Sequence, residues 1–134
     1  MKVAELEGAL LDYWAGRANG WTCNANAQHK ILCIDVWRDH DGKIAFIPAQ
    51  SYRPSTDWNH GGPIIARNNI TLLDPNYCNS GQWAAYMGAF PDVRDDRVVG
   101  MVAAGAGPTP LIAAMRAYVV SKFGDDVPDI EKPL

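Results

Sequence analysis

A segment near the middle of the chain, Gln50 to Pro63, is rich in the residue types that bind small polar molecules. Its aromatic side chains, Tyr52 and Trp58, offer flat apolar faces on which a ring can stack, and Arg53 offers a cation. Short hydrogen-bonding side chains stand beside them, namely Ser55, Thr56, Asp57 and Asn59. Ligand pockets combine apolar walls with a few polar groups in this way. The segment therefore predicts a site for a small polar molecule that contains a ring.

A nucleotide-derived ligand fits this mixture of side chains. A base would stack on Trp58, ribose hydroxyls would donate to Asp57, and Arg67 is a candidate partner for a phosphate or else a solvated cation. A second anion site is conceivable where the glycine-rich segment Ala103–Gly107 leads into a helix capped by Thr109, although the neighbouring prolines remove backbone donors. The predicted ligand-binding residues are Tyr52, Arg53, Ser55, Thr56, Asp57, Trp58, Asn59, Gly62, Arg67 and Thr109.

An ordinary structural role for the same segment stays open. Ser55 could cap a helical turn, Asp57 could bond its own backbone, and Trp58 could fill the core. The pair Gly61-Gly62 could simply turn the chain. A loop of more than about 12 residues in a small domain is usually functional or disordered, and the aromatic residues here argue against disorder, which favours a function.

Catalysis and metal binding have weaker support in the sequence. Asp57 and His60 are three residues apart, but no nucleophile or second carboxylate can be tied to them. The cysteines are Cys23, Cys33 and Cys78, an odd number that favours reduced thiols over disulfides. Their spacing lacks the paired short arms of a zinc site. We therefore predict no catalytic residue, no metal and no cofactor.

Length and composition bound the classes of protein that remain. The chain has 134 residues, 48% hydrophobic and 20% charged, which predicts one globular domain over residues 1–134. No apolar run is long enough for a membrane span. The formal net charge of −3 argues against a nucleic-acid partner. The opening residues do not form a signal-peptide pattern, so an intracellular location is expected.

Hydrophobic periodicity predicts two helices, Val3–Arg17 and Leu111–Phe123, the second capped by Thr109 with Pro110 at its first position. A hairpin is expected from His29–Trp37 and Lys43–Ala49. The further predicted strands are Ile64–Ala66, Ile70–Leu73, Gln82–Met87 and Arg97–Ala104, with a turn-rich stretch at Gly88–Asp96 and a frayed tail at about 125–134. The predicted fold class is α+β, with a mostly antiparallel sheet flanked by the N-terminal and C-terminal helices.

Several motifs together resemble the NinX family of small tailed-phage and prophage proteins. They are Glu5–Trp14, Ser55–Trp58, Gly61–Ile65, Trp83–Ala85, Thr109–Arg116 and Ser121–Gly124. The resemblance spans nearly the whole chain except residues 24–49, and implies phage origin and therefore the host cytoplasm. It implies no activity, because that family has no settled biochemical role. A weaker likeness, in loop composition and size only, links the Thr-Asp-Trp segment to phage proteins that sequester cyclic ADP-ribose signals of bacterial defence.

These observations lead to one functional prediction and two alternatives. The chain is expected to bind a nucleotide-derived host defence signal, such as a cyclic ADP-ribose or a cyclic nucleotide, and to hold it without turnover. One alternative is a protein-interaction factor that inhibits a host enzyme. The other is a small phosphoesterase or nucleosidase that works through Asp57 and His60. A homo-oligomer is also expected, because the apolar stretch Met87–Phe90 can bury more surface by pairing.

Overall fold

The structure, a computed structural model, describes residues 1–19, 37–38, 44–45, 52–77, 81–88, 90–92, 97–99 and 102–128. The helices are η1 (Val3–Glu5), α1 (Gly8–Ala18), α2 (Trp58–Asn68) and α3 (Pro110–Phe123). The strands are β1 (Trp37–Arg38), β2 (Ile44–Ala45), β3 (Thr71–Leu73), β4 (Trp83–Met87), β5 (Phe90–Asp92), β6 (Arg97–Val99) and β7 (Ala103–Gly107). Of the described helices, none is long and apolar enough to cross a membrane.

The main sheet is antiparallel and has the order β3-β4-β7. Its register places Ala85 at the centre, opposite Leu72 on β3 and Gly105 on β7. Two further antiparallel ribbons join β1 to β2 and β5 to β6. With helices near both ends of the chain and an antiparallel sheet between them, the predicted α+β class is confirmed.

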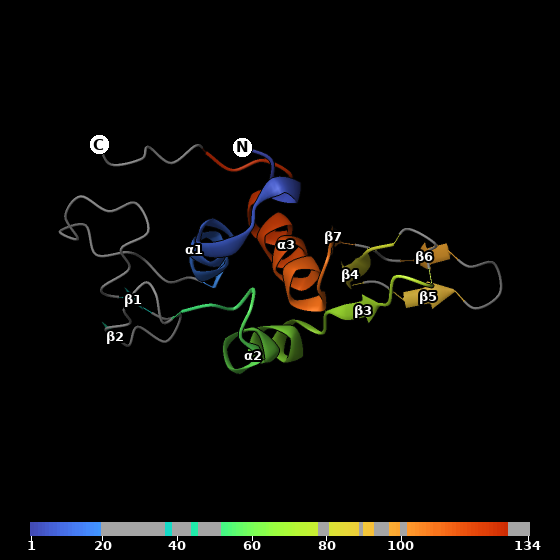
Figure 1. Cartoon of the computed structure of the whole chain (residues 1–134), viewed down its shortest axis with the longest axis horizontal. Helices are drawn as coiled ribbons and strands as arrows, with labels where there is room; N and C mark the ends of the chain where they lie inside the picture. The colour runs from blue at the N-terminus through green and yellow to red at the C-terminus, as the bar shows by residue number, and fades with distance from the viewer. Residues whose placement is uncertain are drawn as a thin grey trace.

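Helix α3 lies at the centre of the molecule, with α1 on one side and the sheet on the other (Figure 1). Thr109 Oγ1 accepts a hydrogen bond from Ile112 N at 3.1 Å, and Pro110 occupies the first turn, as predicted. Nearly every residue from Leu111 to Val119 is buried. A helix that is apolar on all sides must be enclosed by other parts of the protein, and the burial of α3 agrees with this rule.

The glycine-rich segment Ala103–Gly107, which leads into α3 as expected, forms strand β7. A Cβ atom at Gly105 would lie 2.5 Å from both Ala113 O and Ala117 N. The glycine therefore lets the backbone of α3 approach the backbone of β7 directly. The expected single strand Arg97–Ala104 is likewise divided between β6 and β7.

The predicted N-terminal helix is real but begins later than expected. Leu6 and Glu7 are extended, with ψ angles of 136° and 166°, so they separate the short helix η1 from α1. This break places the Leu6 side chain in the core, where it is 1% exposed, and turns its carbonyl toward Arg116 Nε. The core that forms around α1 and α3 includes Leu11, Trp14, Met115, Tyr118 and Val119.

The second half of the expected loop Gln50–Pro63 is helical, and so is the expected strand Ile64–Ala66, because α2 covers both. Asp57 caps this helix by accepting a hydrogen bond from Asn59 N at 2.9 Å. Gly61 lies where α2 meets the preceding segment and α3, since a Cβ atom there would overlap the Pro54 carbonyl and lie 2.6 Å from Leu111 Cδ2. Tight packing thus outweighs the poor helix propensity of glycine and proline.

Some of the remaining secondary-structure predictions are confirmed, and others are wrong or lie outside the described residues. Strands β3 and β4 confirm two predicted strands, and the short strand β5 lies inside the stretch expected to be only turns. The pairs Trp37↔Ala45 and Arg38↔Ile44 agree with the expected hairpin, whose other residues lie outside the described part. Residues 129–134 and all three cysteines also lie outside it.

The first residues of the chain lie beside residues 125–127. Val127 N donates to Met1 O at 2.9 Å, and Val3 N donates to Asp125 O at 3.0 Å. The Val127 side chain is 3% exposed. The residues Asp125–Val127 are therefore held against the N-terminus by hydrogen bonds (Figure 1).

Candidate functional site

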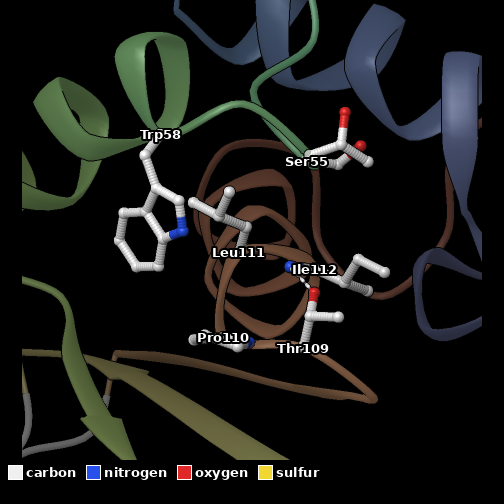
Figure 2. A pocket seen from close by; sticks show the side chains of 7 residues that line it. Ser55, Trp58, Thr109, Pro110, Leu111 and Ile112 are labelled. Carbon is white, nitrogen blue, oxygen red and sulfur yellow. Dashed lines mark hydrogen bonds between the residues drawn. The ribbon is translucent and has the colours of Figure 1, made fainter.

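A pocket of about 230 Å³ lies where the start of α2 meets the start of α3. Its lining combines hydroxyl-bearing and apolar side chains: Ser55, Thr56, Trp58, Thr109, Pro110, Leu111 and Ile112. Four of the residues predicted to bind a ligand are among them. They come from segments about 50 positions apart in the sequence, which the fold brings together (Figure 2).

Trp58 is the largest side chain of the pocket and the most available to a ligand. It begins α2, is 54% exposed, and extends from α2 toward the start of α3, near Pro110 and Leu111 (Figure 2). Within the described part of the chain, no residue accepts a hydrogen bond from its indole N–H. A core role for Trp58 is therefore wrong, and its ring face and its donor can both reach a bound molecule.

The start of α3 forms the opposite wall. Thr109 Oγ1 accepts from Ile112 N, so one of the backbone donors at this helix start is already used (Figure 2). Pro110 has no N–H to offer. The wall therefore presents mainly apolar surface, from Pro110, Leu111 and Ile112, and is a poor cradle for a phosphate.

The segment that carries Ser55 and Thr56 is held in place from behind by α1. Thr56 N and Asp57 N both donate to Arg53 O, at 3.1 and 2.7 Å, which closes a tight turn. Ser55 N donates to Asp12 Oδ1 at 2.8 Å, and Asp12 is 6% exposed. This bond fixes the turn, and with it the start of α2, to helix α1.

The carboxyl group of Asp12 is electrostatically unusual. Burial raises its pKa above the ordinary value, while hydrogen bonding to Ser55 and the charge of Arg53 act in the opposite direction. The Ser55 hydroxyl is itself sealed from solvent and meets no described partner with full hydrogen-bond geometry, although it lies close enough to Asp12 to stabilise the carboxylate. Asp12 was not predicted from the sequence, since a single acidic residue in an amphipathic helix gives no signal.

The other predicted ligand-binding residues do not line this pocket. Tyr52 is buried, at 7% exposed, and its ring lies 5.5 Å from that of His60. Gly62 lies in α2, where a Cβ atom would be 4.0 Å from Trp58 Cε3. Arg67 lies in the last turn of α2 and donates to Asn19 Oδ1 on α1 at 2.6 Å. The residues that the pocket lining leaves out are thus Tyr52, Arg53, Asp57, Asn59, Gly62 and Arg67.

Asp57 and His60 lie close together but are arranged as structural groups. The closest approach, His60 Nδ1 to Asp57 Oδ2, is 3.8 Å. His60 Nδ1 accepts a hydrogen bond from Arg53 N at 3.0 Å, so this nitrogen carries no proton that it could donate to Asp57. Asp57 in turn caps α2. The pair therefore lacks the base-and-orienting-carboxylate geometry of an acid–base catalyst.

Three residues of the pocket, Pro110, Leu111 and Ile112, were missed by sequence reasoning. They were assigned to a helix, and no motif indicates that a helix start will face a tryptophan from another segment.

The described residues also contain no group of three or more His, Cys, Asp or Glu side chains that could hold a metal ion.

Fold and pocket together define a small α+β protein in which the exposed Trp58 side chain lines a pocket without charged residues. The family model described as Bacteriophage P22, NinX matches residues 2–122, and the chain belongs to this phage family. The comparison with curated proteins found no match. The weaker likeness to proteins that sequester cyclic ADP-ribose finds no support in these matches.

Proposed function

We propose that this phage protein binds a small ring-bearing molecule between Trp58 and the start of α3 and holds it without turnover. The observation that carries the proposal is the exposed Trp58 ring, placed beside the hydroxyl groups of Thr56 and Thr109. A half-exposed tryptophan that lines a pocket offers the apolar surface that ligand sites present to a ring. The hydroxyl groups add the polar contacts that orient a ligand.

A nucleotide-derived defence signal remains the ligand class that we propose, and the base is the part that would occupy the pocket. Stacking of a base on an aromatic side chain contributes about 1 to 3 kcal/mol. The lining carries no charged side chain, so phosphates would lie outside the hollow, toward solvent. Sequestration of such a signal needs affinity and abundance only, which suits a protein made during phage infection.

The size of the pocket supports a second candidate, a protein-interaction role. At about 230 Å³ it is smaller than the roughly 300 to 1,000 Å³ of most ligand sites, so it can enclose one ring. That ring could instead be an aromatic or proline side chain of a host enzyme. Trp58 would then be an anchor residue, because tryptophan is among the residues that dominate binding at interfaces.

Incubation with candidate ligands separates these functions. The protein would be mixed with cyclic ADP-ribose isomers and cyclic dinucleotides, washed, heated, and the released molecules analysed by mass spectrometry. Intact recovery is the expected result, chemical conversion would reveal an enzyme, and failure to retain any of them would refute the nucleotide proposal and favour the protein-interaction role.

A matched pair of variants tests the site itself. Trp58→Ala should weaken retention by about 5- to 150-fold, the equivalent of losing one stacked base. Tyr77→Ala is the control, because Tyr77 is equally exposed, at 53%, but does not line the pocket. Equal retention by both variants would show that the ligand binds elsewhere.

A further inference from the structure

A second pocket, of about 280 Å³, lies on another part of the molecule, between η1, the edge strand β7 and the second half of α3. Its charged lining residues are Lys2, Arg116 and Asp125, and the rest of its lining is main chain and small apolar side chains. Lys2 and Asp125 are exposed, whereas Arg116 is 9% exposed. A nearly buried arginine in a pocket wall needs an explanation, because arginine is rarely buried without a partner.

The hydrogen bonds of Arg116 account for only part of its donors. Nε donates to Leu6 O at 2.9 Å and Nη1 donates to Ala106 O at 2.8 Å. A guanidinium has five N–H bonds, so three remain, one on Nη1 and two on Nη2. Among the described residues none accepts them, and no carboxylate forms an ion pair with this side chain.

The two remaining donors on Nη2 of Arg116 are not sealed from solvent. In the described part of the chain, two side-chain polar atoms are buried from solvent and have no hydrogen-bond partner. They are Trp14 Nε1 and Ser55 Oγ. Nη2 of Arg116 is not one of them, so this atom is not sealed from solvent, and Arg116 lines the pocket. The two carbonyl oxygens that hold Arg116 are neutral and fix its orientation without compensating its charge.

The electrostatics of the surroundings are consistent with a cation that lacks a close counter-charge. Burial lowers the pKa of the Arg116 guanidinium, and the more distant carboxylate of Glu7 raises it. Arginine remains protonated throughout the physiological range. Lys2 adds a second positive charge to the same pocket and Asp125 removes one, which leaves a local excess of one positive charge in a protein whose net charge is −3.

We infer that this pocket is an oxyanion site, in which Arg116, oriented by Leu6 O and Ala106 O, binds a carboxylate or phosphate group with the help of Lys2. Guanidinium groups bind such oxyanions through paired N–H donors in a fixed planar geometry. The small side chains of Ala104 and Ala106 leave room for the group beside the strand edge. This site shares no lining residue with the pocket of Trp58, so it stands or falls independently of the proposed function.

The test is titration of the ¹⁵N-labelled full-length protein with inorganic phosphate in one arm and with acetate in another, at constant ionic strength. The amide signals of Lys2, Ala104, Ala106 and Val120 should shift in a saturable way in at least one arm. A stronger response to phosphate would assign phosphorylated ligands, and a stronger response to acetate would assign carboxylates. Absence of saturable shifts in both arms would overturn the proposal.

Variants separate this site from general attraction of anions. Arg116→Gln should weaken binding by about 10- to 150-fold, as expected for lost charge-assisted hydrogen bonds. Arg17→Gln removes the same charge from an exposed position of α1 and should leave binding unchanged. Equal loss in the two variants would contradict a specific site. Should Arg116→Gln fail to fold, the exposed Lys2→Gln still tests the proposal, with an expected weakening of about 2- to 5-fold.

Discussion

At the scale of single residues, two tryptophans illustrate how burial divides structural from binding roles. Trp14 is 7% exposed and makes edge contacts with Tyr13 and Phe123, with ring centroids 5.3 and 5.4 Å away. Trp58 is 54% exposed on the first turn of α2. The Trp14 side chain contributes to the core, whereas the exposed surface of Trp58 can contact a binding partner.

This difference predicts opposite effects of truncation on stability. Trp14→Ala should lower the free energy of unfolding by about 3 to 5 kcal/mol, because it opens a cavity in the core. Trp58→Ala should lower it by less than about 1 kcal/mol while weakening ligand retention. Urea unfolding followed by circular dichroism measures both values. A large loss of stability in Trp58→Ala would place that residue in the core after all.

A second residue-scale prediction concerns the pH dependence contributed by Asp12. Because burial raises its pKa in the folded state, the folded protein binds a proton at this site more readily than the unfolded chain does. The contribution of Asp12 to stability is therefore complete below the unfolded pKa of about 3.9 and is lost as the pH rises through the folded pKa. Asp12→Asn keeps an acceptor for Ser55 N and has no charge, so its stability relative to the wild type should increase over that interval.

Urea unfolding of both proteins at a series of pH values checks this sign. The comparison isolates Asp12, since the other carboxyl groups are common to the two chains. Asp12→Ala serves as the control for the hydrogen bond, because it leaves Ser55 N unpaired and should be about 1 to 3 kcal/mol less stable than Asp12→Asn at every pH. A difference between Asp12→Asn and the wild type that does not vary with pH would contradict the raised pKa.

At the scale of elements, α2 positions the pocket because it packs very closely against its neighbours. A Cβ atom at Gly61 would overlap the Pro54 carbonyl and the Leu111 side chain, whereas a Cβ atom at the next residue, Gly62, would meet only the Trp58 ring, at 4.0 Å. Both glycines lie in the same helix and lack a side chain. They therefore form a matched pair in which only one position has no room for a methyl group.

The expected outcome is opposite signs for the two alanine variants. Gly61→Ala should destabilise the protein by about 1 to 3 kcal/mol, since the added methyl group must displace backbone or Leu111. Gly62→Ala should be neutral or stabilise it by up to about 1 kcal/mol, through better helix propensity. Thermal unfolding of the two variants measures the contrast, and equal destabilisation would mean that α2 is not packed as described.

At the scale of the whole molecule, the described part of the sheet has two edge strands, β3 and β7. Edge strands present unpaired backbone groups that can pair with another chain. Met87, at the end of β4, is only partly buried and begins the apolar stretch that led us to expect self-association. Both features give a second copy of the chain something to bind.

We therefore expect a homodimer related by a two-fold axis, the commonest form of homo-oligomer. Light scattering coupled to size-exclusion chromatography at micromolar concentration should return about twice the mass of 14.7 kDa. Met87→Lys, at a partly buried position next to the proposed contact, should shift the equilibrium toward the monomer. A monomer mass for the unaltered protein would refute the prediction.

The features that the sequence alone determined are those whose signals are local. Thr109, Pro110 and Gly124 mark the ends of α3 through capping and backbone geometry, which involve only neighbouring residues. The apolar face of α1 follows from short-range periodicity in the same way, and the composition of β3 and β4 indicates short strands. The sequence alone indicated residues from both halves of the pocket, Ser55–Trp58 and Thr109. It could not show that these two segments lie next to each other in the fold.

The tertiary structure decided the features in which packing overrides local preference. Gly61, Gly62 and Pro63 favour a loop, yet all three lie within α2. At position 61 only a glycine permits the close approach of α2 to Pro54 and Leu111. Gly105 similarly belongs to a strand because α3 lies directly against it. Arg116 gave no signal of its own in the sequence, since its surroundings come from Leu6 and Ala106, and contacts between distant segments are energetic terms that no local pattern contains.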